Sequence, residues 1–193
     1  MRRRTFDALV SVAGLVLAAV LVVAGGLLLW GHNFTDNQVS SQLAAQKIVF
    51  PTKSNPEFKA LPPADAAAMG QYAGQQMTTG AQAKVYADNF IAFHLSKMGG
   101  TYAALSAQSL AQPNNAKLAG LVNTVFKGTT LRGMLLNAYA FWQMGAIALW
   151  GAIASFIGAI LLLILSVLGF VHARRTGPAK EILAPHTAEK VTA

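Results

Sequence analysis

Two long stretches of this chain carry no charged side chain, and they constrain its fold more than any other feature. The first extends from Ala8 to Trp30, and its 23 residues also lack Asn and Gln. As a helix this stretch is about 34 Å long at 1.5 Å per residue, which exceeds the roughly 30 Å hydrocarbon core of a bilayer. We therefore expect a transmembrane helix at residues 8–30.

The second uncharged stretch, residues 133–171, is too long for one span. Placing the span at residues 149–171 gives the same length as the first. It also brings Trp30 and Trp150 to the outer ends of the two spans, where indole rings favour the membrane interface. No proline interrupts residues 130–148, and apolar side chains recur there every three to four positions. We expect the second span to continue outward as one long helix.

Basic residues flank the two spans on the same side of the membrane. Arginines occupy positions 2–4, and Arg174, Arg175 and Lys180 follow the second span. The positive-inside rule then places residues 1–7 and 172–193 in the cytoplasm, with both termini on that side of a bacterial plasma membrane. A cleaved signal peptide is the alternative for the first span, but its apolar region is longer than the usual 7 to 15 residues and no convincing small-x-small cleavage site precedes Trp30.

Composition agrees with a membrane protein. Only 11% of the residues are charged, against roughly 25% in an average soluble domain. The formal net charge of +8 would suggest a nucleic-acid partner in a soluble protein, but the position of the charges matters more than their sum, and we expect no nucleic-acid binding. The absence of cysteine excludes disulfides, thiolate metal sites and thiol catalysis.

The segment between the spans, residues 31–148, shows helical rather than alternating patterns, and we expect a small antiparallel helical domain outside the cytoplasm. Its aromatic residues Tyr86, Phe90 and Phe93 share one helix face and are expected in its core.

Capping and breaking residues predict where the helices of this segment begin and end. The expected starts are at Thr35 or Asp36, at Asp65, after Thr79, at Thr101, after Pro113 and Asn114, and at Thr129 or Thr130. The expected ends are before Pro51, at Gln76, at Gly99, at Ala111 and at Gly128. Residues 49–63 suit an extended connector because they contain four prolines. The tail after Arg175 is expected to be disordered.

No catalytic, cofactor or metal site is expected. The acidic residues between the spans are Asp36, Glu57, Asp65 and Asp88, and the four histidines never occur at metal-ligand spacing. Asp88 and His94 are six positions apart, about 240° around a helix, so neither can orient the other directly.

The second span carries small residues at four-residue steps, namely Gly151, Ser155 and Ala159, with Ala154 and Gly158 beside them. Small side chains at this spacing let another helix approach closely. The first span offers a complementary face through Gly14 and Ala18, although a second copy or a foreign membrane protein would fit the same pattern. No span contains an ionisable residue, which argues against a channel or pump.

Several stretches resemble a family of two-span actinobacterial membrane proteins that often carry the label of aromatic ring-opening dioxygenase. They are RRRTFD (2–7), GGLLLWGHNFTDNQV (25–39), QLAAQKIVFP (42–51), TGAQAKVYADNFIAFHL (79–95) and FKGTTLRGMLLNAYAFWQMG (126–145). The resemblance implies a plasma membrane in a Gram-positive-type envelope, but no activity and no functional residues. The residues do not support the label, because such enzymes hold iron through histidine and carboxylate ligands, and His32 and His94 have no suitable acidic neighbours.

The sequence therefore predicts a non-enzymatic integral membrane protein that acts through its extracytoplasmic helical domain. It would serve as an accessory subunit or as an envelope-associated binding or scaffold protein. Its partners would be the lipid bilayer and another membrane or envelope protein, or a second copy of itself. A membrane-tethered enzyme and a two-span sensor are the alternatives.

Overall fold

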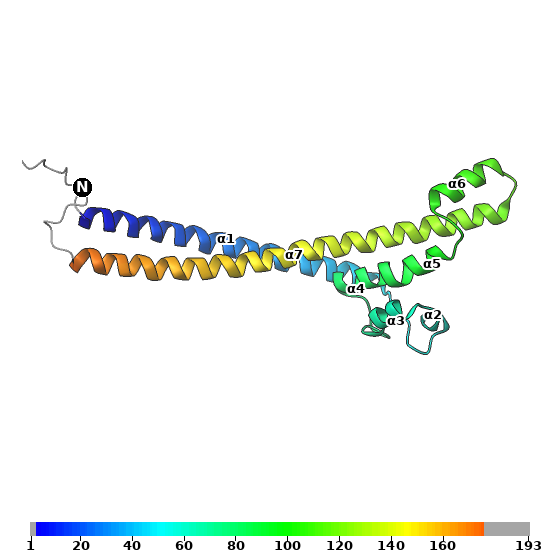
Figure 1. The fold of residues 1–193 in the computed structure, drawn as a ribbon, viewed down its shortest axis with the longest axis horizontal. Coiled ribbons are helices and arrows are strands. Elements are labelled where there is room, and N and C mark those ends of the chain that lie inside the picture. The colour runs from blue at the N-terminus through cyan, green and yellow to red at the C-terminus, as the bar shows by residue number, and fades with distance from the viewer. Residues whose placement is uncertain (1–2, 176–193) are drawn as a thin grey trace, which may run out of the picture. The chain divides into compact units, whose positions relative to one another are not determined.

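The computed structural model describes residues 3–175 of the chain (Figure 1). Every regular element in this part is a helix, and the only β-type pairing there is an isolated bridge between Val49 and Gln76. The predicted all-α class is therefore confirmed. The last helix extends to Arg175, so residues 172–175 of the expected cytoplasmic segment are helical; the tail after Arg175, which is expected to be disordered, lies outside the described residues.

The chain forms two compact units. Among the described residues, one contains residues 3–30 and 148–175, and the other contains residues 31–147. We call the first the paired-helix unit and the second the 31–147 unit. The two longest helices contribute to both units, whereas all the shorter helices belong to the 31–147 unit.

The first helix, α1 (Arg3–Gln46), is uninterrupted over 44 residues. The expectation of a new helix at Thr35 or Asp36 is therefore wrong. The Thr35 hydroxyl lies 3.0 Å from the carbonyl oxygens of both Gly31 and His32, so it bonds back to the preceding turn instead of capping a following one. The helix ends where Lys47 adopts a left-handed backbone conformation, with φ at 53°.

The last helix, α7 (Ala116–Arg175), runs without a break through residues 130–148, as the absence of proline predicts. Asn115 caps its start by accepting a hydrogen bond from the Leu118 backbone N–H at 3.0 Å. The expected stop at Gly128 is wrong, as is a new start at Thr129 or Thr130. A Cβ on Gly128 would lie 2.7 Å from Leu95 Cδ2, so this glycine permits close packing inside a continuous helix.

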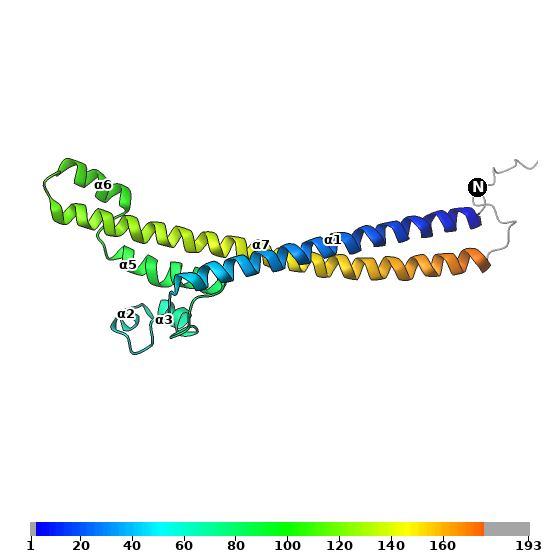
Figure 2. The same ribbon diagram turned by 180° about the vertical axis from the view of Figure 1, so that it is seen from behind.

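In the paired-helix unit α1 and α7 lie side by side and antiparallel (Figures 1 and 2). Contacts pair early residues of α1 with late residues of α7: Ser11 with Gly169, Gly14 with Ser166, Leu21 with Gly158, and Leu28 with Gly151. Small buried residues form the seam between them, and on α7 they recur every seven positions as Ala152, Ala159, Ser166 and Ala173. A seven-residue repeat is the spacing that keeps one face of a helix against a partner.

Both helices are long and apolar enough to cross a membrane. Only 11% of the most apolar 18-residue window of each is buried, whereas the core helix of a soluble protein is mostly buried. These properties suggest a membrane protein.

The segment after α1 contains two short helices, α2 (Pro56–Lys59) and α3 (Pro63–Gly70). The connector is therefore not wholly extended: the Asn55 side chain accepts a hydrogen bond from the Glu57 N–H at 2.8 Å and starts a turn at Pro56. The helix expected to reach Gln76 stops at Gly70 instead. Gly74, with φ at +76°, has a backbone conformation incompatible with its continuation.

Thr79 caps α4 (Gly80–Val85) as predicted, in a capping box with Gln82. The helix then widens into a π-helical turn, η1 (Tyr86–Ile91), before α5 (Ala92–Ser96). Thr101 caps α6 (Tyr102–Ala111), a helix that was predicted at residues 101–111, and α6 lies along the start of α7 in both views (Figures 1 and 2).

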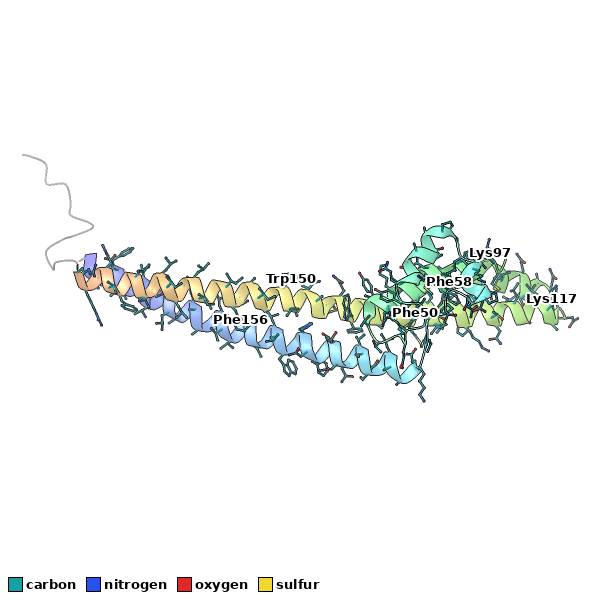
Figure 3. All side chains as sticks on the ribbon, turned by 90° about the horizontal axis from the view of Figure 1, so that it is seen from below. Phe50, Phe58, Lys97, Lys117, Trp150 and Phe156 are labelled. Carbon is teal, nitrogen blue, oxygen red and sulfur yellow. The ribbon has the colours of Figure 1, made fainter. Side chains whose placement is uncertain are left out.

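The core of the 31–147 unit joins α1, α7 and the helices from α2 to α5. Phe50 and Phe58, labelled in Figure 3, are buried in it. The predicted core residues Tyr86, Phe90 and Phe93 are partly buried and pack against it. Its buried members are Val39, Leu43, Phe50, Phe58, Leu61, Met69, Met77, Ala83, Ala87, Ile91 and Leu135.

Candidate binding groove

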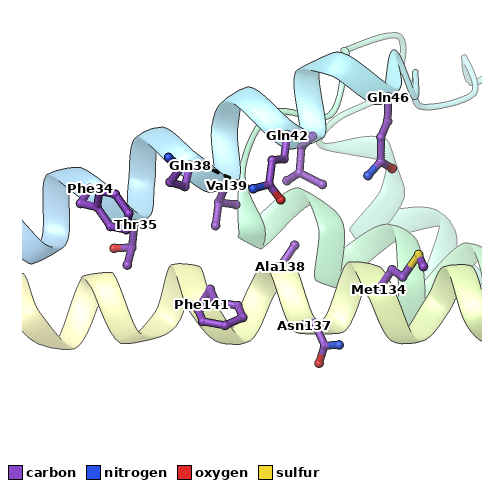
Figure 4. Close-up of a pocket in the computed structure, with 11 residues that line it drawn as sticks. Phe34, Thr35, Gln38, Val39, Gln42, Gln46, Met134, Asn137, Ala138 and Phe141 are labelled. Carbon is purple, nitrogen blue, oxygen red and sulfur yellow. Dashed lines mark hydrogen bonds between the residues drawn. The ribbon is translucent and has the colours of Figure 1, made fainter.

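A groove of about 530 Å³ lies between α1 and α7 within the 31–147 unit (Figure 4). This volume is within the range of about 300–1,000 Å³ that is typical of small-molecule sites. It is lined by Phe34, Thr35, Gln38, Val39, Gln42, Leu43, Gln46, Met134, Asn137, Ala138 and Phe141. None of these side chains is charged.

One wall of the groove is a row of three amide side chains on α1. Gln38, Gln42 and Gln46 follow each other at four-residue steps, so they share a helix face and rise about 6 Å from one to the next. The Gln42 Nε2 donates to Gln38 Oε1 over a long 3.5 Å contact. In the described chain, no other side-chain hydrogen bond engages these three amides, which leaves most of their donors and acceptors for a ligand or water.

The wall formed by α7 is apolar apart from Asn137. Met134 and Phe141 extend from α7 and are 61% and 58% exposed, and Phe34 on α1 is 52% exposed (Figure 4). The floor consists of Val39 and Leu43, which are buried and belong to the core. Their burial ties the α1 wall to the packed part of the unit, so this wall is a fixed scaffold for the amide row.

At one end of the groove the two helices come into close contact. A Cβ on Gly145 would overlap the Thr35 hydroxyl, so only glycine fits there without displacement. His32 Nδ1 lies 3.0 Å from the Gly145 carbonyl oxygen. A carbonyl only accepts, so Nδ1 carries the proton in this pair. The groove opens from this contact toward Gln46.

Three charged residues of the unit, Lys84, Asp88 and Arg132, meet outside the groove lining. Asp88 forms ion pairs with Lys84 at 2.6 Å and with Arg132 at 2.8 Å. Partial burial opposes ionisation of Asp88, but the hydrogen bonds and charges of Lys84 and Arg132 outweigh it and lower its pKa. The hydrogen bond and charge of Asp88 in turn raise the pKa of Lys84.

Arg132 also donates through Nε to the Ala87 carbonyl at 3.2 Å. It therefore connects α7 to η1 through both a side chain and the backbone. Burial, with a smaller contribution from Glu57, raises the pKa of Tyr86 in the same turn. These contacts explain Asp88 as a structural residue.

The residues considered for catalysis or metal binding remain apart. His94 Nδ1 donates to the Phe90 carbonyl at 2.7 Å and its ring packs against Phe90, while Asp88 is occupied by Lys84 and Arg132. Within residues 3–175, no group of three or more His, Cys, Asp or Glu side chains could hold a metal ion.

The structure places the predicted helix-packing residues at different depths in the paired-helix unit. Ala18 and Ala159 are each 1% exposed and lie in the seam. Gly14 faces Ser166. At the edges of the seam, the side chain of Leu28 packs against Gly151 and that of Leu21 packs against Gly158. Ser155 is half-buried and Ala154 is exposed. The seam also contains Ala152, Ser166 and Ala173, which a search for four-residue steps misses and a search for seven-residue steps finds.

The predicted interface anchors project outward from the helix pair. Trp30 and Trp150 are 66% and 70% exposed, and Trp150 is labelled in Figure 3. Indole rings in such positions suit a membrane interface, and this role stays a prediction.

The chain matches no family model, no curated protein and no solved structure. The resemblance to actinobacterial two-span proteins therefore stays a prediction.

Proposed function

We propose that the protein is a non-enzymatic, two-span plasma-membrane protein that binds a partner outside the cytoplasm through the groove between α1 and α7. It would act as an accessory subunit or an envelope-associated scaffold. The observation that carries this proposal is the uncharged groove, where a row of three glutamines on α1 faces exposed phenyl and thioether groups.

The membrane placement rests on the composition of α1 and α7 and on their basic flanks. The most apolar part of each helix has few buried residues, which suits lipid contact. Arginines near both chain ends place those ends in the cytoplasm by the positive-inside rule. The 31–147 unit would then lie outside, where an envelope component can reach the groove.

The lining favours binding over catalysis. General acid–base chemistry needs a titratable group within about 3 Å of the reacting atom, and the groove lining supplies only amide, hydroxyl, thioether and hydrocarbon groups. Such groups can hydrogen-bond and pack against a partner without altering it. A membrane-tethered enzyme finds no support in this surface.

Site-specific photocrosslinking in intact cells tests the proposal. A benzoylphenylalanine placed at position 42 should form an adduct with one identifiable envelope or membrane component. The matched control is the same probe at position 108, because Gln108 is an exposed glutamine on α6, outside the groove. Gln46→Leu should reduce the adduct at position 42 while leaving the amount of protein in the membrane unchanged.

Identical adducts from positions 42 and 108 would overturn the proposal, because the groove would then have no special role. A product consisting of two copies of this chain would redirect it to self-association. Turnover of a bound substrate by purified protein would favour the enzyme alternative.

A further inference from the structure

The groove's chemistry narrows the class of its partner. An ionised ligand would find no opposite charge in the lining, so ions and strongly charged polymers are poor partners. A lipid acyl chain would also fit poorly, because it would remove water from the glutamine amides without returning hydrogen bonds. The remaining class is uncharged and carries both hydrogen-bond donors and acceptors.

A glutamine side chain offers an NH₂ donor and a carbonyl acceptor, the same two functions as a peptide group. An extended polypeptide presents an N–H and a C=O together on one edge at every second residue. These pairs repeat at about 6.6 Å, because each residue of a strand rises about 3.3 Å. The glutamine row repeats at about 6 Å along α1.

We propose that the groove binds an extended, uncharged segment of a partner polypeptide, whose backbone N–H and C=O pairs are held by Gln38, Gln42 and Gln46. This inference rests on the proposed function and specifies the partner of the same groove. Across all three glutamines the two repeats differ by about 1.2 Å, calculated from the two rises. Flexible glutamine side chains can absorb that difference.

The apolar wall suits the side chains of such a segment. Successive side chains of a strand point to opposite faces, so alternate residues would meet the wall while the others face solvent. Phe34, Met134 and Phe141 would receive the inward ones, and methionine adapts to varied shapes. From Phe34 to Gln46 the α1 wall is about 18 Å long, enough for about five extended residues.

A folded helix is a weaker candidate, because its backbone groups already bond to each other and would leave the glutamines facing side chains only. A neutral glycan could bond to the amides through its hydroxyl groups. It would not, however, depend on backbone N–H donors, and this difference separates the two partners experimentally.

The test uses the full chain in lipid nanodiscs and a defined set of probes. The main probe is a library of acetylated and amidated octapeptides built only from uncharged residues. The same library with every second residue N-methylated lacks one edge of N–H donors and is made in both registers. A tetramer of N-acetylglucosamine serves as the glycan probe.

We expect the unmethylated library to contain binders whose affinity falls at least about 10-fold in one methylation register, since several hydrogen bonds are lost together. Each of Gln38→Ala, Gln42→Ala and Gln46→Ala should weaken binding by about 3- to 10-fold. Gln42→Glu, which keeps size but loses the NH₂ donors, should weaken the same peptides. Gln108→Ala, the matched control, should leave binding unchanged, and an unchanged thermal midpoint of each variant shows that it has folded.

Binding that is insensitive to methylation in both registers, or to the glutamine substitutions, would overturn the inference. So would binding of the glycan probe in place of the peptides. In either case a specific photocrosslink from position 42 would leave the proposed function standing. Failure of both the crosslink and all the probes would reject the groove as a binding site.

Discussion

Gly169 of α7 faces Ser11 of α1 so closely that a Cβ on Gly169 would overlap the Ser11 hydroxyl. The hydroxyl is also held in place, because it donates to the Asp7 carbonyl at 2.8 Å. Three residues away the roles are exchanged, and Gly14 of α1 faces Ser166 of α7. Two reciprocal glycine–serine contacts therefore bring the helices together, and they allow the pairing to be tested by single substitutions.

We expect Gly169→Ala to destabilise the helix pair by roughly 1–3 kcal/mol, the usual cost of overpacking a close contact. Gly26→Ala is the matched control, because a Cβ there meets nothing within 4 Å. Unfolding by detergent titration measures both variants. Adding Ser11→Ala to Gly169→Ala should recover most of the loss, since it removes the obstructing hydroxyl. Equal midpoints for the two glycine variants would contradict the close contact.

Phe50→Ala should destabilise the 31–147 unit more than Phe90→Ala. Phe50 is 1% exposed and its ring contacts Tyr72 and Tyr86, with centroids 5.4 and 5.3 Å away, whereas Phe90 is only partly buried. Truncation of a buried phenylalanine costs about 3–5 kcal/mol, so Phe50→Ala should make the unit readily cleaved by protease. Limited proteolysis of the whole protein ranks the variants. Faster cleavage of Phe90→Ala would show that the core is centred elsewhere.

The ion pairs of Asp88 should make stability depend on acid pH. Lys84 and Arg132 lower the pKa of Asp88 in the folded state despite its partial burial. Such a group stabilises the fold above its unfolded pKa of about 3.9, and this contribution is lost as the pH falls through the lower folded value. Thermal midpoints should therefore fall more steeply below about pH 4 in the wild type than in Asp88→Asn. Asp36→Asn, which alters an exposed acid on α1, should keep the wild-type profile. Parallel profiles for wild type and Asp88→Asn would contradict the prediction.

Topology can be read with single cysteines because the chain contains none. We expect an impermeant thiol reagent to label Gln108→Cys in intact cells, and to label Thr187→Cys only after the membrane is opened. Gln108 suits this test because it is exposed, whereas Gln82 is buried. Labelling of Thr187→Cys alone in intact cells would reverse the proposed orientation.

Local sequence signals predicted some helix ends and missed others, for a physical reason. Thr79 and Thr101 do cap helices, since their side chains accept backbone hydrogen bonds from the next turn. Thr35 and Gly128 carry similar signals but lie inside long helices, because contacts across the fold use them instead: Gly145 packs against Thr35, and Leu95 against Gly128. A single sequence does not show whether such a residue ends a helix or makes a tertiary contact inside one.

The groove was not predicted, although its amide row is visible in the sequence as Gln38, Gln42 and Gln46 at four-residue steps. A polar stripe on a helix usually faces water, and only the position of α7 shows that this stripe lines a groove. The π-helical turn at Tyr86–Ile91 was missed for a related reason. Its contacts with Arg132 come from 44 and 45 positions away in the chain, beyond the reach of local patterns.

The register of the helix pair also limits how the length of the protein can change during evolution. Inserting or deleting one residue in either partner would turn the following part of that helix by about 100°. Leucine and isoleucine would then replace alanine, glycine and serine in the seam. Tolerated length changes in residues 3–30 or 148–175 should therefore come in steps of seven residues, or as matched changes in both helices. Related chains should vary freely in length only in segments that do not pair along another helix, such as residues 49–63.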